Sequence, residues 1–224
     1  NGLSDLLALE GSSYDLNINM FNHFQNTITG WPGGKPGADD STRPERKSPN
    51  SKRVIIFSPH PDDDVVSMGG TFDRLVSQGH EVHIAYQVKG NIAVSDHDAL
   101  KFIEVSKDMF KNNSKVPAGQ LIKELVNNKP DKIDSQAVRD LKGFIRKREA
   151  IAATRYIGIP DSNTHFMNLP FYDTGRIKKN PPTTKDVLIT ASLIKKIKPH
   201  QIFAAGDLED PHGTHKVCLD VILD

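Results

Sequence analysis

The sequence predicts an α/β domain in which helices cover both faces of a mostly parallel sheet. Short apolar runs at 54–58, 80–88 and 201–205 have the length and composition of buried strands. Stretches with helical periodicity separate these runs along the chain. Strands that alternate with helices indicate βαβ crossovers, and such crossovers join parallel neighbours.

The elements follow one another regularly from residue 53 onward. The run at 54–58 predicts the first strand, and the run at 80–88 predicts the second. A brief strand is expected at 165–169, and 201–205 is the last predicted strand. Helices are predicted at 65–78, 98–111, 118–127, 135–156, 184–197 and from residue 213 onward.

Residues 1–52 differ in composition from the rest of the chain. One or two short helices are expected near the start. Residues 30–53 are rich in proline, glycine and charge, which is typical of an extended linker or a surface arm. We therefore expect an N-terminal arm and linker at 1–52 and a folded domain at 53–224. Because the chain begins with Asn1 and ends at Asp224 inside a predicted helix, we expect a piece of a longer protein, with the domain incomplete at its C-terminus.

Composition excludes several classes of partner. The 224 residues carry 29 Lys and Arg against 28 Asp and Glu, so no electrostatic footprint for nucleic acid is expected. No apolar run is long enough to predict a membrane span. Cys218 is the only cysteine, so no internal disulfide can form, which is consistent with a reducing, cytoplasmic location. The sequence leaves open whether the protein is a homo-oligomer.

An acidic cluster follows the first predicted strand in the stretch SPHPDDD. In parallel α/β sheets, ligands bind outside the carboxyl ends of the strands. His60 and Asp63 lie three residues apart in a proline-containing turn, so they can converge on one divalent cation. Such a cation would relieve the repulsion among Asp62, Asp63 and Asp64. The alternative is a helix start rich in capping aspartates, beside which His60 is incidental.

A second polar cluster favours the metal-binding interpretation. The last strand ends in GDLEDPHGTHK, where His212 and His215 are again three residues apart in a proline-containing turn. Two histidine-bearing loops that each follow a strand are hard to explain by chance. The sequence therefore predicts one site built from both loops.

Three stretches resemble the LmbE-like, or PIG-L, family of zinc-dependent de-N-acetylases. SPHPDDDVVSMGGT resembles the family's (A/S)HPDDE signature, and DPHGTH stands where the family has HPDH. KREAIAATRYIGIP is similar to its Arg-Glu helix before a glycine-bearing turn. The resemblance covers the chain from Arg53 to the C-terminus, and it implies a Rossmann-like three-layer sandwich, the LmbE-like fold.

A further resemblance concerns the linker. TGWPGGKP together with SPHPDDDVVSMGGT is similar to the C-terminal part of glucosamine-6-phosphate deaminase-like fusion proteins, which carry an LmbE-like domain behind a deaminase-like domain. This resemblance implies that residues 1–52 connect to a deaminase-like domain in the full-length chain.

The family resemblance also implies roles for individual residues. The metal ligands would be His60, Asp63 and His215, holding Zn²⁺, although a site of this type also suits Fe²⁺ or Co²⁺. Asp62 matches the general base that takes a proton from the attacking water. His212 would stabilise the developing oxyanion, and either Asp62 or His212 would protonate the leaving amine.

The chain departs from the family pattern at three positions. Thr214 stands where the family has an Asp before its last histidine, Gly213 stands where it has a proline, and Asp64 replaces the usual Glu. A carboxylate that would orient a histidine is therefore missing from the motif, although Asp207, Glu209 or Asp210 could supply it.

Weaker patterns suggest substrate contacts. Lys89 and Asn91 follow the second strand and could contact a sugar or its phosphate, or they could form a plain loop. Arg148 lies on the apolar face of its helix, so its charge either reaches the surface or reaches the site with Glu149. The remaining candidates lie in LPFYDTGR and would line a substrate rim: Tyr172, Asp173 and Arg176.

Together these patterns predict a metal-dependent hydrolase that removes acetyl from an N-acetylated amino sugar, such as N-acetylglucosamine or its 6-phosphate. The alternative is a metal- and sugar-binding module of weak catalytic power that regulates or assembles the fused deaminase. Thr214 is the feature that favours this alternative. A phosphoesterase fits less well, because such sites usually need more carboxylates and two metals.

Overall fold

Four parallel strands form the centre of the molecule in the computed structural model, which describes residues 2–27, 51–109, 118–128, 132–176, 178–206, 209 and 211–224. The sheet has the order β3-β2-β1-β4. Its strands are β1 (Arg53–Ser58), β2 (Glu81–Tyr86), β3 (Thr164–Phe166) and β4 (Gln201–Ala204). All three pairings are parallel, so the four carboxyl ends lie along one edge of the sheet.

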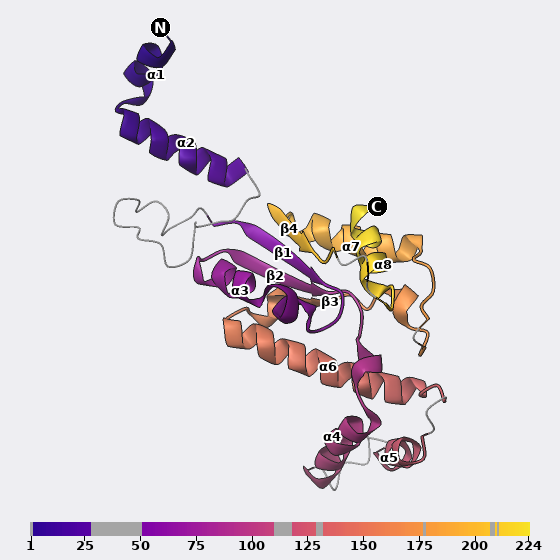
Figure 1. Cartoon of the computed structure of the whole chain (residues 1–224). Coiled ribbons are helices and arrows are strands. Elements are labelled where there is room, and N and C mark those ends of the chain that lie inside the picture. Colours follow the sequence, from indigo (N-terminus) through magenta and orange to yellow (C-terminus); the bar gives the residue numbers. More distant parts are fainter. Residues whose placement is uncertain are drawn as a thin grey trace.

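Helices cover both faces of this sheet. The helices α3 (Asp63–Ser77) and α6 (Gln136–Ile157) lie on one face, and α7 (Thr184–Ile197) and α8 (Thr214–Leu223) lie on the other (Figure 1). The predicted three-layer α/β sandwich is therefore confirmed, and with it the Rossmann-like fold.

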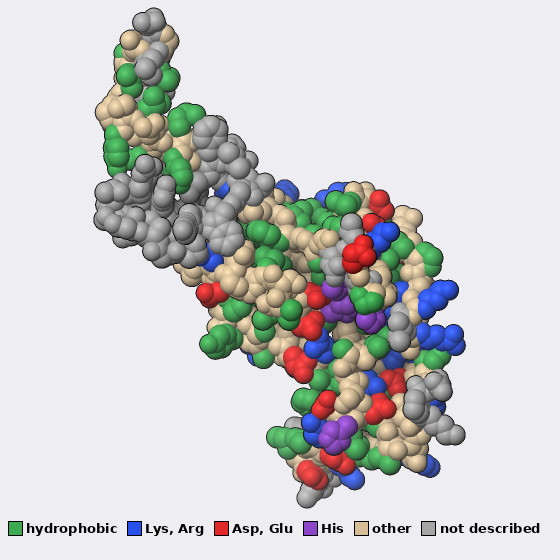
Figure 2. All heavy atoms as spheres, in the orientation of Figure 1, with side chains coloured by type: hydrophobic (Ala, Val, Ile, Leu, Met, Phe, Trp, Pro, Cys, Tyr) green, Lys and Arg blue, Asp and Glu red, His purple; other side chains and the backbone are tan. Residues whose placement is uncertain are grey.

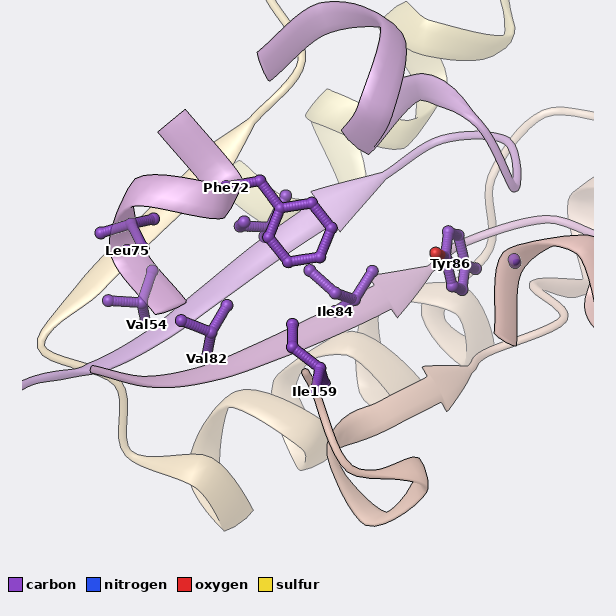
Figure 3. Packing of buried hydrophobic residues seen from close by; sticks show 9 residues of the cluster. Val54, Phe72, Leu75, Val82, Ile84, Tyr86 and Ile159 are labelled. Atoms are coloured by element: carbon purple, nitrogen blue, oxygen red, sulfur yellow. The ribbon is translucent and has the colours of Figure 1, made fainter. Parts of the chain in front are cut away.

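The burial of β1 explains its continuous apolar sequence. Val54 and Ile56 pack with Phe72 and Leu75 of α3, as Figure 3 shows for Val54 and the two α3 residues. The alternate residues Ile55 and Phe57 face the other layer, together with Ile197 of α7. Because both faces of this strand are covered by helices, every position along it faces an apolar layer, and its sequence is continuously apolar.

Element ends match the predictions closely, with one clear difference. The strand expected at 165–169 is shorter, because β3 ends at Phe166. Asn168 then takes a left-handed backbone conformation with φ of 49°, which extended pairing cannot accommodate. A second irregularity lies in α3, where Met68 is non-helical just before Gly69 and Gly70. Two adjacent glycines weaken a helix at such a point.

A second group of helices packs beside the amino-terminal half of α6. These helices are α4 (Asp96–Met109) and α5 (Ala118–Val126), and they share a core with Val138 and Ile145 of α6. Lys142 of α6 reinforces the contact, because its ammonium lies 2.6 Å from Asp96 and 2.7 Å from Asp134. Short 3-10 turns occur before α4 and on either side of β3: η2 (Asn91–Ala93), η3 (Asp161–Asn163) and η4 (Pro170–Tyr172).

Two further helices precede the sheet, α1 (Gly2–Glu10) and α2 (Ser13–Thr27), and both lie away from the sandwich in Figure 1. Most of the predicted linker, residues 30–50, falls outside the described residues, so the division into an arm at 1–52 and a domain at 53–224 stays a prediction. No helix in the described ranges combines the length and hydropathy needed to cross a bilayer.

Candidate metal centre

Two loops meet at the carboxyl edge of the sheet. β1 and β4 are parallel neighbours, so the turn after Ser58 and the turn after Ala204 leave the sheet side by side. The first turn runs directly into α3, and the second leads to α8, which carries His215 in its first turn. The fold therefore brings together residues that are 155 positions apart, as the contact between His60 and His215 shows.

His60, Asp63 and His215 form a compact group of possible metal ligands. Nδ1 of His60 lies 3.2 Å from Oδ2 of Asp63 and 3.2 Å from Nε2 of His215. The same Asp63 oxygen lies 3.3 Å from Nε2 of His215. The side chains of Asp63 and His215 are each 17 % exposed, and that of His60 is 24 % exposed, so the group is accessible to solvent. Histidine side chains are visible at the surface of the domain in Figure 2.

The spacing of these three atoms fits a single divalent cation. A tetrahedral ion with bonds of about 2.0–2.1 Å separates its ligands by roughly 3.3–3.4 Å. The observed separations of 3.2–3.3 Å are close to that value. Two imidazoles and one carboxylate leave further coordination positions for water and substrate, as catalytic zinc sites require. The donor set is equally compatible with Fe²⁺ or Co²⁺.

Asp63 is held in its ionised form by its neighbours. Burial raises the pKa of its carboxyl, but hydrogen bonds from the ring and the backbone amide of His60, with the charge of His215, outweigh burial and lower the pKa overall. The amide of His60 donates to Oδ2 of Asp63 at 2.7 Å. A carboxylate ligand must be ionised, and the His60 backbone amide favours that form whatever the protonation state of the two imidazoles.

Asp64 points inward and anchors the loop. It is 2 % exposed and accepts a hydrogen bond from the hydroxyl of Tyr86 at 2.9 Å. Its backbone amide donates to the hydroxyl of Ser58 at 3.0 Å. Burial is the main reason that the pKa of Asp64 is raised. The third aspartate thus fixes the position of the turn that carries His60 and Asp63.

Asp62 lies at the N-cap of α3, outside the ligand group. Its Oδ2 is 2.8 Å from Nη2 of Arg146, and Arg146 also contacts Glu149 through Nη1 at 3.3 Å. The Asp62 side chain is 49 % exposed, whereas that of Arg146 is only 15 % exposed. A carboxylate beside the ligand group is therefore held in place by a guanidinium on α6.

The second histidine loop contributes differently from the first. His212 is exposed in the turn before α8, and its catalytic role stays a prediction. Thr214 stands at the position of the expected aspartate. Its side chain is buried and supplies no carboxylate. Of the three acidic residues that could replace this carboxylate, Glu209 is exposed, and Asp207 and Asp210 lie outside the described residues.

Several predicted substrate residues lie close to the ligand group. The ring of Tyr172 packs edge-on against His60, with centroids 6.0 Å apart, and burial is the main reason that its pKa rises to about 12. Asn91 is buried at the start of η2. The preceding Gly90 has φ of 64°, and a Cβ there would lie 2.7 Å from Cδ of Pro61. This close approach packs the loop after β2 against the turn that bears His60.

Lys89 belongs to this loop, and its Nζ lies 3.8 Å from Oδ2 of Asp173. Arg148 and Arg176 are placed less favourably. Arg148 is exposed, and its charge acts on Asp161 in η3, near the other end of β3. Arg176 is exposed, and its carbonyl accepts hydrogen bonds from Thr174 and Lys179. The structure gives no contact of either residue with the ligand group, so both assignments stay predictions.

Arg146 is the residue of this site that the sequence did not identify. The periodicity of α6 indicates Arg148, whereas Arg146, two residues earlier, points to the opposite side of the helix and reaches Asp62. The spacing of Arg146 and Glu149, three residues apart on one helix face, was the available signal.

A cavity of about 370 Å³ lies against the ligand group, and its walls include Asp63, Asp64, Met68 and His215. Met68 reaches this position at the non-helical point of α3. The centre is therefore open to a small molecule at the carboxyl edge of the sheet, where α/β folds commonly bind ligands.

The chain is similar to known proteins over most of its length. Residues 55–224 match the family described as PIG-L, GlcNAc-PI de-N-acetylase. A glucosamine-6-phosphate deaminase-like protein of Bacteroides thetaiotaomicron is 54 % identical over 229 residues, which cover 99 % of this chain. The chain spans about a third of that relative's length, 34 %. Because the family match includes the sheet and both histidine loops, the chain belongs to the PIG-L, or LmbE-like, family.

Proposed function

We propose that this domain is a metal-dependent amidase that removes the acetyl group from an N-acetylated amino sugar, with N-acetylglucosamine or a derivative of it as substrate. The observation that carries the proposal is the group formed by His60, Asp63 and His215, whose ligand atoms lie 3.2–3.3 Å apart, next to the Asp62 carboxylate that Arg146 holds, in a member of the PIG-L family.

The chemistry divides between the ligand group and Asp62. A divalent cation held by the three side chains would lower the pKa of water from about 15.7 to roughly 7 and polarise the acetamide carbonyl. Asp62 takes a proton from the attacking water at its carboxylate, whose orientation Arg146 fixes. His212 stabilises the oxyanion that develops on the carbonyl oxygen. The proton returns to the leaving amine from Asp62 or from His212.

A longer relative suggests where the product of this reaction would be used. The relative that is 54 % identical is described as glucosamine-6-phosphate deaminase-like and is about three times as long as this chain. We infer that the chain belongs to a protein with a deaminase-like domain, for which deacetylation would supply an amino sugar with a free amine.

Two variants and one control test the proposal. Zinc content is measured by mass spectrometry, and turnover is measured as amine release from N-acetylglucosamine. His215→Ala should lose both zinc and turnover. Asp62→Asn should keep zinc and lose turnover by about 10²–10⁴-fold, the usual contribution of a general base. His97→Ala changes an exposed histidine on α4 and should alter neither quantity.

A second candidate function rests on Thr214, which is buried where the family motif has a carboxylate. The domain would then bind a metal and a sugar without efficient hydrolysis, and would regulate or assemble the deaminase-like part. Wild-type protein that retains zinc and binds N-acetylglucosamine, but releases no amine, would establish this alternative and exclude the amidase.

A further inference from the structure

A groove beside the ligand group contains charged side chains whose arrangement indicates which substrates it can bind. Two cavities of about 260 and 410 Å³ share Lys89 and Asn168 in their walls. We call them together the Lys89 groove; its walls include Pro61, Lys89, Asp140, Asn168, Tyr172 and Asp173. Pro61 follows His60 directly, and the Tyr172 ring contacts that of His60, so the groove begins next to the ligand group.

The central cation of this groove is already engaged. Nζ of Lys89 donates to Oδ1 of Asp140 at 3.1 Å and lies 3.8 Å from Oδ2 of Asp173. Asp140 is positioned from its other side by Gln136, whose amide donates to the same oxygen at 3.0 Å. The methylene stem of Lys89 lies against Gly143 of α6, 3.5 Å from the point where a Cβ would stand. Lys89 is therefore fixed between two carboxylates.

The other cations around the groove also have partners within the described residues. Lys147 lies over the ring of Phe166, 4.7 Å from its centroid, and Lys179 lies over the ring of Tyr172 at 3.7 Å. Burial lowers the pKa of Lys179 to about 8. Two further ion pairs lie beside the groove: Arg139 with Asp173 at 3.7 Å and Arg146 with Asp62 at 2.8 Å.

These contacts decide between two kinds of substrate. In the described walls Lys89 is the cation that lies beside carboxylates, at 3.1 Å from Asp140 and 3.8 Å from Asp173. A phosphate dianion would have to break the pair at Lys89 and would then face two carboxylates. A sugar hydroxyl can instead donate to a carboxylate or accept from Lys89 or Asn168 without displacing an ion. Like charges that exclude a competitor are a common source of specificity.

We infer that the Lys89 groove binds an uncharged, hydroxyl-rich part of the substrate, and that Asp140 is the residue that discriminates against a phosphate there. The inference rests on the proposed function in taking an amino sugar as the ligand. It extends that function by selecting the unphosphorylated sugar over its 6-phosphate.

The test compares N-acetylglucosamine with N-acetylglucosamine 6-phosphate, using the full chain with its bound metal. Binding is measured by calorimetry and turnover as kcat/KM. The wild-type protein should prefer the uncharged sugar by about tenfold or more. Asp140→Asn leaves Lys89 with fewer negative neighbours and should shift the ratio toward the phosphate by about tenfold. Asp98→Asn, an equal charge change at a half-exposed side chain of α4, should leave the ratio unchanged.

The possible outcomes distinguish the inference about the Lys89 groove from the proposed amidase activity. A wild-type preference for the phosphate, no binding of either sugar, or an unchanged ratio in Asp140→Asn would overturn the inference. A folded, zinc-containing protein that binds only the uncharged sugar but releases no amine would overturn the proposed amidase while supporting the inference. Thermal melts of both variants establish that the change lies in the groove and not in folding.

Discussion

At the scale of single residues, the three consecutive aspartates after β1 have three different tasks. Asp62 faces outward to Arg146, Asp63 turns toward the two histidines, and Asp64 is buried beneath them. Like charges so close together are tolerated because each one has its own partner or cation. The acidic run at the end of a buried strand is thereby explained: each carboxylate is needed in a different direction.

The pair of arginines on α6 gives a prediction with an internal control. Arg146→Met should lower kcat for amine release by roughly 10–100-fold, because Asp62 loses the group that orients it. Zinc content should stay unchanged, and Arg146→Lys should recover part of the loss. Arg148→Met, an exposed change two residues away, should stay within about twofold of wild type. Equal effects at both positions would show that Arg146 has no special relation to Asp62.

At the scale of elements, the contact of α4 and α5 with α6 depends on a partly buried ion network. Lys142 is 6 % exposed and joins Asp96 at the start of α4 to Asp134 before α6. Asn128, after α5, donates to both of these carboxylates at 2.9 Å. Burial lowers the pKa of Lys142, but the hydrogen bonds to Asp134 and Asp96 outweigh it and raise the pKa overall. The network therefore adds directional contacts that fix how α4 and α5 are oriented against α6, which a small apolar core alone does not specify.

Replacing Lys142 should destabilise this contact. Lys142→Met leaves two carboxylates close together without their cation, so the free energy of unfolding should fall by about 1–3 kcal/mol. Amide hydrogen exchange should rise in α4 and α5 before it rises in the sheet. Lys101→Met removes an exposed pair with Asp98 and should cost less than about 0.5 kcal/mol. Urea titrations of both variants measure the difference, and similar losses would contradict a special role for Lys142.

At the scale of the whole molecule, most of the architecture follows from the sequence. A parallel sheet, its helical layers and the meeting of two histidine loops are consequences of buried runs, helical periods and the carboxyl-edge rule. What pattern reading misses depends on side-chain direction. Arg146 rather than Arg148 reaches the site, and Asp140 pairs with Lys89 across 51 residues. Such contacts depend on how two distant elements pack together, and the sequence of either element alone does not determine that packing.

The pairing of β2 with β3 makes the stability of the whole fold sensitive to acid. Nδ1 of His83 on β2 lies 3.1 Å from Nε2 of His165 on β3, and the rings stack with centroids 5.3 Å apart. Burial, then the charges of His83 and Lys196, lower the pKa of His165 to about 4. Glu81 lies 3.1 Å from the other nitrogen of His83. The folded state thus favours the neutral ring of His165.

The sign of the pH dependence follows from this shift. Between about pH 4 and pH 6.5 the unfolded chain binds a proton at His165 that the folded chain does not, so stability rises with pH in that window. The contribution is complete above about pH 6.5 and is lost as the pH falls toward 4. His165→Gln removes the titrating ring, so its urea midpoint should fall less than that of wild type between pH 7.5 and pH 4.5. Parallel midpoints for the two proteins would exclude His165 as a source of acid sensitivity.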